Sequence, residues 1–361
     1  MNPINVPSPG QPLRVGSPDS ILAVIPALLG FHPADSLVVV GTAPPSGRVQ
    51  VAFRYDLPDP PDPGAAAKIA AHATNVLVRH DLTTAVLAGY GPGAAVTPVT
   101  DALVAELRRT GIKLHDVLRV HDGRYWSYAC QDPQCCPPEG VPFDPTSHPA
   151  AQALAAAGNT ALADRAAVAA SIAPLTGRSA TSMRQAVQRA EDHINGILDG
   201  ATAGKDRSKA MHEVVTAGLS TVQEAIATYR DGGQITSDDQ FARLAVGIED
   251  LRVRDDAWAR MEPEHAKAHL RLWTDLVRHA PARYVPAPAS LLAFTAWQSG
   301  NGALANVAAQ QALAANPNYS MALLLLEAIS AGAPPSAARL PMTPEEVAAS
   351  YAHTTSRRMR G

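Results

Sequence analysis

The sequence predicts an α/β domain followed by an all-helical domain. Up to about residue 146, β-branched runs alternate with helical patterns, whereas beyond it nearly every segment repeats its apolar residues with the period of an amphipathic helix. The length of 361 residues suits about two domains. We therefore predict a first domain over residues 1–146, with a mixed sheet of about five strands and flanking helices, and a helical second domain over 147–361.

The elements of the first domain follow from capping residues, periodicity and chain breakers. A Ser-Pro pair at 17–18 and Gly30 bound a first helix, in which Pro26 predicts a kink. A continuous apolar run then predicts a strand buried on both faces, and an alternating run predicts a half-exposed strand. The expected order is helix, strand, strand, helix, strand, helix, strand, strand, with strands at 36–41, 49–57, 83–88, 113–120 and 124–130 and the second helix at 65–80.

The second domain shows amphipathic stripes, one beginning at Met183 and another at Met211. Residues 287–332 contain two helical stretches, which are separated by a glycine-containing turn at 300–302 and end near Pro317. Small residues at these spacings resemble a tetratricopeptide unit, although only one unit is clear and an ordinary helix hairpin explains it as well. We expect a flexible C-terminal tail after this hairpin.

Composition and charge exclude several classes of protein. The chain has 30 Lys+Arg against 33 Asp+Glu, and its only cationic cluster is Arg357, Arg358 and Arg360, so we expect no nucleic-acid partner. The N-terminus lacks the basic-then-apolar order of a secretory signal, and no apolar run approaches the roughly 20 residues of a membrane span. Three cysteines are too few for a disulfide framework. We expect a cytoplasmic protein with no membrane partner.

The three cysteines fall within seven residues, at Cys130, Cys135 and Cys136, in a Pro-rich loop after a predicted strand. Random placement would scatter them, so the clustering favours a local role. Three interpretations stay open. The favoured one is that the thiols pack the loop against the sheet. The second is a reversible disulfide that includes Cys130. The third is a zinc site with His121 or His148 as a fourth ligand, for which the spacing is unusual and the candidates are weak.

Two further turns contain residues that could bind or react. Gly89 and Gly91 follow a predicted strand and precede a helix, a context that suits an anion held by backbone donors, although a tight turn suffices. His32 and Asp35 precede the first strand and could pair for acid–base work, although a capped turn is the preferred interpretation.

Two aromatic residues stand just before the cysteines. Trp126 and Tyr128 share one face of the last predicted strand and could line a pocket, although core packing explains them as well. We predict that the turns carrying His32, Gly91 and Cys130 meet at one edge of the sheet and enclose a shared hollow. A small ligand would bind in that hollow.

Three segments carry a resemblance to a known family: LLGFHPADSLVVVG from Leu28, GRYWSYACQDPQCCPPEGVPF from Gly123, and LLAFTAWQSGNGALANVAAQQAL from Leu291. Together they resemble the actinobacterial family known as domain of unknown function 4192, over nearly the whole chain. The resemblance implies a single shared architecture and a cytoplasmic actinobacterial protein. It implies no activity, cofactor or substrate, and no catalytic residue.

No complete catalytic set accompanies these motifs. We therefore expect a non-enzymatic, ligand- or protein-binding regulatory or scaffold protein, with a protein partner at the helical domain and a small ligand at the α/β domain. The alternatives are a thiol-dependent enzyme, redox or hydrolytic, that uses the loop of Cys130, Cys135 and Cys136, and a structural zinc-loop protein. The sequence names no cofactor and does not decide whether a reaction is catalysed.

Overall fold

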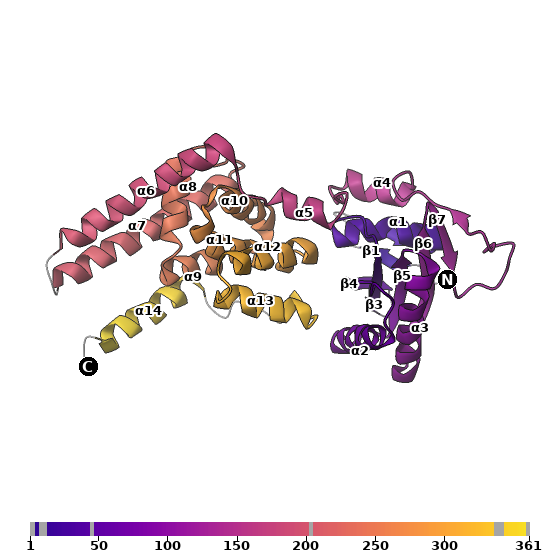
Figure 1. Ribbon diagram of the computed structural model, residues 1–361. Helices are drawn as coiled ribbons and strands as arrows, with labels where there is room; N and C mark the ends of the chain where they lie inside the picture. Colours follow the sequence, from indigo (N-terminus) through magenta and orange to yellow (C-terminus); the bar gives the residue numbers. More distant parts are fainter. Residues whose placement is uncertain (1–3, 7–12, 44–46, 202–204, 336–342, 359–361) are drawn as a thin grey trace. The chain divides into compact units, whose positions relative to one another are not determined.

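The chain folds into two compact units, which we describe from a computed structural model (Figure 1). The structure describes residues 4–6, 13–43, 47–201, 205–335 and 343–358. One unit comprises Met1–Val168 with Ala331–Ala333, and the other comprises Ala169–Ser330 with Pro334–Gly361. A mixed sheet with flanking helices precedes a helical region, which confirms the predicted fold class. The predicted change of character at residue 146 lies inside the first unit.

Eight strands form one sheet in the described part of the chain, in the order β2-β1-β4-β3-β5-β6-β7-β8. Five correspond to expected strands: β3 (Ser36–Ala43), β4 (Arg48–Asp56), β5 (Thr84–Tyr90), β6 (Lys113–His121) and β7 (Arg124–Ser127). The three that the sequence did not reveal are β1 (Ile4–Val6), β2 (Leu13–Val15) and β8 (Val141–Pro142). They have two or three residues each, too few to show a period of two.

The strand register decides which turns lie at the same edge. Strand β3 is antiparallel to both β4 and β5, and β6 is parallel to β5. Ser36 pairs with Tyr90, and Tyr90 pairs with Val120, so the start of β3 and the ends of β5 and β6 share one edge. Strand β7 runs back from this edge and ends at Ser127 opposite Leu118, two residues earlier than Val120 on β6.

Helices cover both faces of the sheet (Figure 1). Helices α1 (Pro18–Leu29) and α4 (Pro149–Ala156) lie on one face, and α2 (Pro63–Arg79) and α3 (Gly93–Thr110) lie on the other. Gly30 ends α1 in a left-handed conformation, with φ of 83°, as the sequence predicted. The core under α2 and α3 is almost entirely aliphatic and includes Leu37, Val39, Leu77, Leu87, Leu103 and Val117.

A short segment from late in the sequence completes the first unit. The Arg79 guanidinium donates to the Ala331 carbonyl at 2.9 Å, and the His80 ring is 2.5 Å from the Gly332 carbonyl. Gly332 has a φ of 64°, and a methyl group there would come within 2.5 Å of Val76. This close approach requires glycine.

The second unit is built from helices whose small residues allow close packing. They are α6 (Gly177–Asp199), α7 (Lys205–Arg230), α8 (Asp238–Gly247), α9 (Leu251–Ala259), α10 (Ala266–His279), α11 (Pro286–Gln298), α12 (Gly302–Ala315), α13 (Ser320–Ser330) and α14 (Pro344–Arg358). Helix α5 (Arg165–Ser171) spans the division, and short 3₁₀ turns lie at Pro263–His265 and Ala282–Tyr284. Every residue of α11 from Pro286 to Trp297 is buried, so this helix is the centre of the unit.

The second unit agrees with some of the expectations from the sequence and departs from others. Helices α11 and α12 pack on each other, but a tetratricopeptide character is not confirmed. Met183 is buried as its stripe predicts, whereas Met211 is 44% exposed. The cationic cluster lies outside the residues whose side chains are described, and where a tail was expected residues 344–358 form α14. No helix within the described ranges has the length and apolarity to cross a bilayer.

Candidate functional site

The first candidate site is the turn between β5 and α3. A methyl group on Gly89 would lie 2.2 Å from Val96, so glycine here lets α3 start directly against the strand end. Gly91 has a φ of 140°, and its N–H donates to the Val120 carbonyl at 2.9 Å. Pro92 precedes the helix and supplies no side-chain cap. Ala95 and Val96 donate to the Pro92 carbonyl at 3.0 and 3.1 Å, whereas in the described part of the chain the N–H groups of Gly93 and Ala94 have no partner.

Arg119 on β6 lies beside this helix start. A methyl group on Gly93 would be 3.9 Å from the Arg119 guanidinium carbon, and that carbon lies 3.5 Å from the centre of the Trp126 ring. Arg119 and Trp126 are cross-strand partners, so the stack is set by the register of β6 and β7. In the described ranges, no ion pair includes Arg119, and its Nε is buried without a hydrogen-bond partner.

Tyr128 extends the same surface. Its hydroxyl lies 2.8 Å from Thr97 Oγ1, one turn into α3. Tyr128 is 38% exposed, and Ala94 in the first turn of the helix is exposed as well. The surface formed by Gly93, Ala94, Thr97, Arg119, Trp126 and Tyr128, which we call the α3-start surface, is thus cationic, rich in donors and open to water.

The second candidate site is the loop that joins β7 to β8 (Figure 1). At its beginning, Ser127 Oγ donates to the buried Asp116 carboxylate at 2.7 Å and accepts from the Ala129 N–H at 3.3 Å. At its end, the Trp126 indole N–H donates to the Pro138 carbonyl at 2.9 Å, and Arg124 donates to the Gly140 carbonyl at 2.8 Å. The fold therefore holds both ends of this loop.

The three cysteines converge inside this loop, and we call them the thiol cluster. Their sulfur atoms all lie within 4.8 Å of one another. Cys130 and Cys136 are half-buried, and Cys135 is exposed. The Asp132 backbone and, with a smaller contribution, Cys136 lower the pKa of the Cys130 thiol. Burial, together with hydrogen bonds to Cys130 and Cys135, raises the pKa of Cys136 to about 12.

The histidines named from the sequence lie apart from the thiols. His121 does not belong to the group of metal-ligating atoms around the three sulfurs within the described ranges. Its Nε2 lies 3.3 Å from the Asp122 carboxylate instead. The His32 N–H donates to the Leu162 carbonyl, and Asp35 takes a φ of 43° while its carbonyl accepts from Leu57. No hydrogen bond or ion pair joins His32 to Asp35 in the described part of the chain.

The register and side-chain contacts place the three turns as follows. The turns of His32 and Gly91 share the Ser36–Tyr90 edge, whereas the thiol loop leaves β7 after Ser127, opposite an earlier part of β6. The Arg119 side chain fills the space between Gly93 and Trp126. The structure thus brings the glycine turn together with Trp126 and Tyr128, and it holds the thiols in a separate loop.

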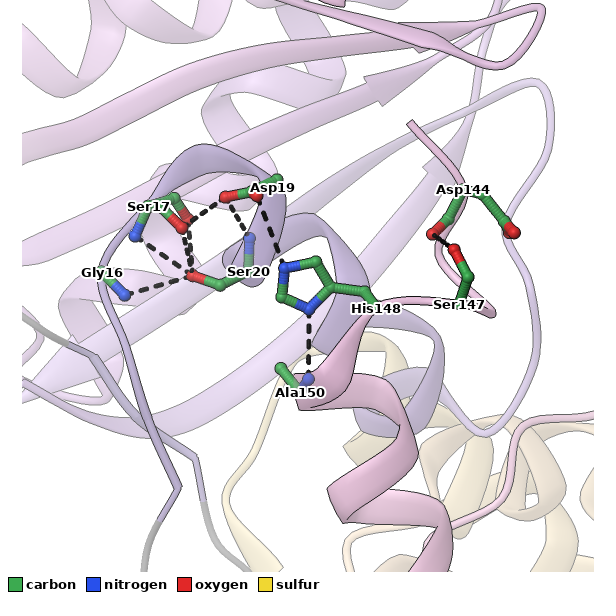
Figure 2. Close-up of polar contacts among 8 residues, drawn as sticks. All are labelled: Gly16, Ser17, Asp19, Ser20, Asp144, Ser147, His148 and Ala150. Atoms are coloured by element: carbon green, nitrogen blue, oxygen red, sulfur yellow. Dashed lines mark hydrogen bonds and ion pairs between the residues drawn. The ribbon is translucent and has the colours of Figure 1, made fainter. Parts of the chain in front are cut away.

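A third cluster of polar residues joins the starts of α1 and α4 (Figure 2). The Asp19 carboxylate accepts from the Ser17 hydroxyl and the Ser20 N–H, and lies 3.5 Å from His148 Nε2. Burial opposes ionisation of Asp19, but these hydrogen bonds and the charge of His148 together keep its pKa below the ordinary value. His148 Nδ1 accepts from the Ala150 N–H at 3.1 Å and caps α4.

This third cluster has a structural role in helix capping. Ser17 contacts the carboxylate of Asp19, not the ring of His148, so the order of contacts differs from a catalytic triad, in which histidine lies between serine and carboxylate. Both ring nitrogens of His148 have partners, which leaves neither free to bind a metal.

Sequence reasoning missed Arg119 and Asp132, which organise the two candidate sites. Arg119 follows the expected alternation of β6 and gives no local signal, because its contact with Trp126 depends on pairing between strands. Asp132 did carry a signal: an Asp two residues before a turn residue often forms an Asx turn. The carboxylate of Asp132 accepts from the Gln134 N–H at 2.9 Å in this way.

A family model described as "Domain of unknown function (DUF4192)" matches residues 18–336 of the chain. No curated protein and no solved structure matches it.

Proposed function

Because the chain belongs to the DUF4192 family, a domain of unknown function, we propose a function from its geometry: a non-enzymatic regulatory protein whose α/β unit binds a small anionic ligand at the α3-start surface. The observation that carries this proposal is Arg119, whose guanidinium stacks 3.5 Å from the Trp126 ring centre and has no acidic partner in the described part of the chain.

Electrostatics support an anionic ligand. The N-terminus of an 18-residue helix carries about half a positive charge, and Arg119 adds a full one beside it. The positive end of the helix and the Arg119 guanidinium repel each other, and an anion bound to both of them removes the repulsion. Backbone N–H groups at a helix start together with a guanidinium are the donors that proteins use for phosphate and carboxylate.

The neighbouring side chains favour a small anionic ligand. The Trp126 ring fixes the plane of the guanidinium, so its donors are held in a constant direction. The hydroxyls of Thr97 and Tyr128 lie together at the border of the surface and can exchange their mutual hydrogen bond for one to a ligand. The ligand class that fits is a phosphate- or carboxylate-bearing small molecule.

We propose a binding protein and not a thiol-dependent enzyme. A thiol enzyme needs a base within hydrogen-bond reach of its sulfur. In the described part of the chain, the ligand atoms grouped with the Cys130 sulfur are the two other thiols, and the group holds no histidine nitrogen or carboxylate oxygen that could act as a general base. This arrangement supports a binding role over a hydrolytic one.

The proposal extends to a cytoplasmic location and to a protein partner at the helical unit. Leu323 and Leu324 on α13 are 45% and 66% exposed and form an apolar surface pair that supports such a partner. A photo-crosslinker at Leu324 should give one discrete product in native lysate, and the same crosslinker at exposed Leu251 should not. Equal labelling from both positions would remove this part of the proposal.

Titration calorimetry of the full chain with inorganic phosphate, and with citrate as a carboxylate probe, tests the anion site. Arg119→Met keeps the length of the side chain and removes its charge, and we expect an affinity at least about tenfold weaker. Arg109→Met, at the exposed C-terminal end of α3, is the matched control and should bind as the wild type does. The proposal fails if Arg119→Met binds the probes unchanged, or if both variants weaken binding equally.

A further inference from the structure

The thiol cluster supports an inference that does not depend on the anion site. Three sulfur atoms that all lie within 4.8 Å of one another have the arrangement of ligands around one ion. Tetrahedral zinc–thiolate bonds of about 2.3 Å place sulfurs about 3.8 Å apart, so a movement of about 1 Å or less completes the geometry. A disulfide would join two of the thiols and leave the third without a role, whereas one metal ion can bind all three.

The local sequence explains how the chain brings the thiols together. After Cys130, the Asp132 carboxylate accepts from the Gln134 N–H and forms a turn. The Asp132 carbonyl then accepts from the N–H groups of Cys135 at 3.1 Å and Cys136 at 2.7 Å, which returns both residues towards Cys130. Asp132 therefore sets the spacing of this motif, although its side chain is not itself within the group of ligand atoms.

The rest of the loop is held independently of the thiols. Ser127 and Asp116 hold its start, and Trp126 and Arg124 hold its end. Gly140 allows the exit turn, with a φ of 81° and no space for a methyl group beneath the Trp126 ring. Because both ends are fixed, ordering the ligands costs less entropy on metal binding than it would in a free peptide.

The fourth coordination position faces solvent. In the described part of the chain, the three sulfurs have no histidine or carboxylate oxygen in their group, and His148 is engaged by Ala150 and Asp19. Cys135 is exposed, so water or a small external ligand can reach an ion from its side. Three protein ligands and one open position are the coordination of a zinc site that remains reactive to exogenous ligands.

We propose that Cys130, Cys135 and Cys136 bind one thiophilic d¹⁰ metal ion as three thiolates, with an open fourth position. Binding forms three metal–sulfur bonds and releases to solvent the protons that the thiols carry, with no change of oxidation state at sulfur. Soft thiolates select zinc or copper(I) over magnesium and calcium, and both of the former share this donor chemistry.

Metal titration of the full chain, reduced and freed of metal, tests the proposal. One equivalent of Co²⁺ should produce a thiolate-to-cobalt charge-transfer band, and one equivalent of Zn²⁺ should abolish it. A parallel titration with Cu⁺ against a copper(I) chelator distinguishes the two candidate ions. Saturation at one equivalent supports the proposal, and the absence of any band from a chain with three free thiols overturns it.

Variants assign the ligands. Cys130→Ser, Cys135→Ser and Cys136→Ser should each weaken binding at least about tenfold, and Asp132→Ala should weaken it by a similar factor through the lost turn. His121→Ala and Ser147→Ala are matched controls and should bind metal as the wild type does. Retention of the band in the triple Cys→Ser chain would overturn the proposal.

A second measurement does not require the variants to fold. Bound metal should protect all three thiols of the wild-type chain from alkylation by iodoacetamide, as read by mass spectrometry. Protection of fewer than three thiols contradicts the three-thiolate site. So does the formation of a disulfide, in place of a metal complex, when metal is added in the absence of a chelator.

Discussion

A methyl group placed on Gly89 would come within 2.2 Å of the Val96 side chain, so the strand end and the first turn of α3 are in direct contact. The space next to the Gly89 Cα is therefore too small for a methyl group. We expect Gly89→Ala to destabilise the α/β unit by about 1–3 kcal/mol, because the helix start must move away from the sheet. Urea unfolding of the full chain measures this loss.

Gly93→Ala is the matched control for that substitution. It lies in the same helix start, and its new methyl group would meet only ordinary contacts at 3.9 Å. Its stability should stay within about 0.5 kcal/mol of the wild type. Equal losses from both variants would show that the Gly89–Val96 contact does not determine where α3 starts.

The buried His269 should make the helical unit sensitive to acid. Burial lowers its pKa to about 4 from an ordinary 6.5, Glu262 partly offsets this, and Arg230 and His265 add to it. The unfolded chain therefore takes up a proton first as the pH falls. The stability from this group is complete above pH 6.5 and decreases by about 3 kcal/mol towards pH 4.

Urea unfolding at several pH values between 7 and 4, followed by circular dichroism, checks this slope. His269→Gln is uncharged at every pH and should lose this part of the pH dependence. A slope in the variant as steep as in the wild type would assign the effect to other groups, of which His265 is the nearest in sequence.

Asp116 should show the opposite dependence. Burial raises the pKa of its carboxyl, although hydrogen bonds from Ser127 and the Val117 N–H act against this, and its Oδ2 has no partner. The folded chain holds this proton more tightly than the unfolded chain does. The stability from this group is therefore complete at low pH and is lost as the pH rises through the folded pKa.

Asp116→Asn removes the buried charge and keeps an acceptor for Ser127. We expect this variant to be about 1 kcal/mol more stable than the wild type at pH 7, with the difference disappearing below pH 3.8. Ser127→Ala should instead be destabilised by about 1 kcal/mol. A loss of stability in Asp116→Asn at pH 7 would show that the charged form is the one the fold needs.

Gly140→Ala should disturb the Trp126 ring. Gly140 has a φ of 81°, and a methyl group there would lie 2.5 Å from a ring carbon of Trp126. We expect a loss of about 1–3 kcal/mol and a shift of the Trp126 indole N–H resonance, because the bond to Pro138 must lengthen. Gly158→Ala is the control for backbone strain alone, because Gly158 has a φ of 85° but no atom lies near a new methyl group. An unmoved indole resonance in Gly140→Ala would contradict the expectation.

The predicted elements with strong periodicity were the ones confirmed. Helix α1 begins after Ser17 and ends at Gly30, and five strands lie where alternating or continuous apolar runs predicted them. The short strands β1, β2 and β8 were missed because their pairing comes from neighbouring strands and not from their own residues. Met211 was placed on a buried stripe and is exposed, because period alone does not tell which turns of a helix have a partner.

In the candidate sites too, features that depend on neighbouring residues were visible in the sequence, and features that depend on strand pairing were not. The clustering of Cys130, Cys135 and Cys136 was visible in the sequence, because seven consecutive residues cannot separate far in space. The position of Arg119 between Gly93 and Trp126 was not visible, because it requires the register of β6 and β7 and the approach of α3. His121 was considered as a metal ligand on nearness in sequence, and its ring instead lies beside Asp122.

The sequence by itself determined the order of helices and strands, the left-handed end of α1 at Gly30 and the presence of three neighbouring thiols, since each depends on residues within one or two turns of chain. Only the tertiary structure decided which turns share a sheet edge, and that Arg119 lies on Trp126 with no acidic partner in the described ranges. Those properties depend on strands that are far apart in sequence and meet through backbone hydrogen bonds, which every residue except proline can both donate and accept.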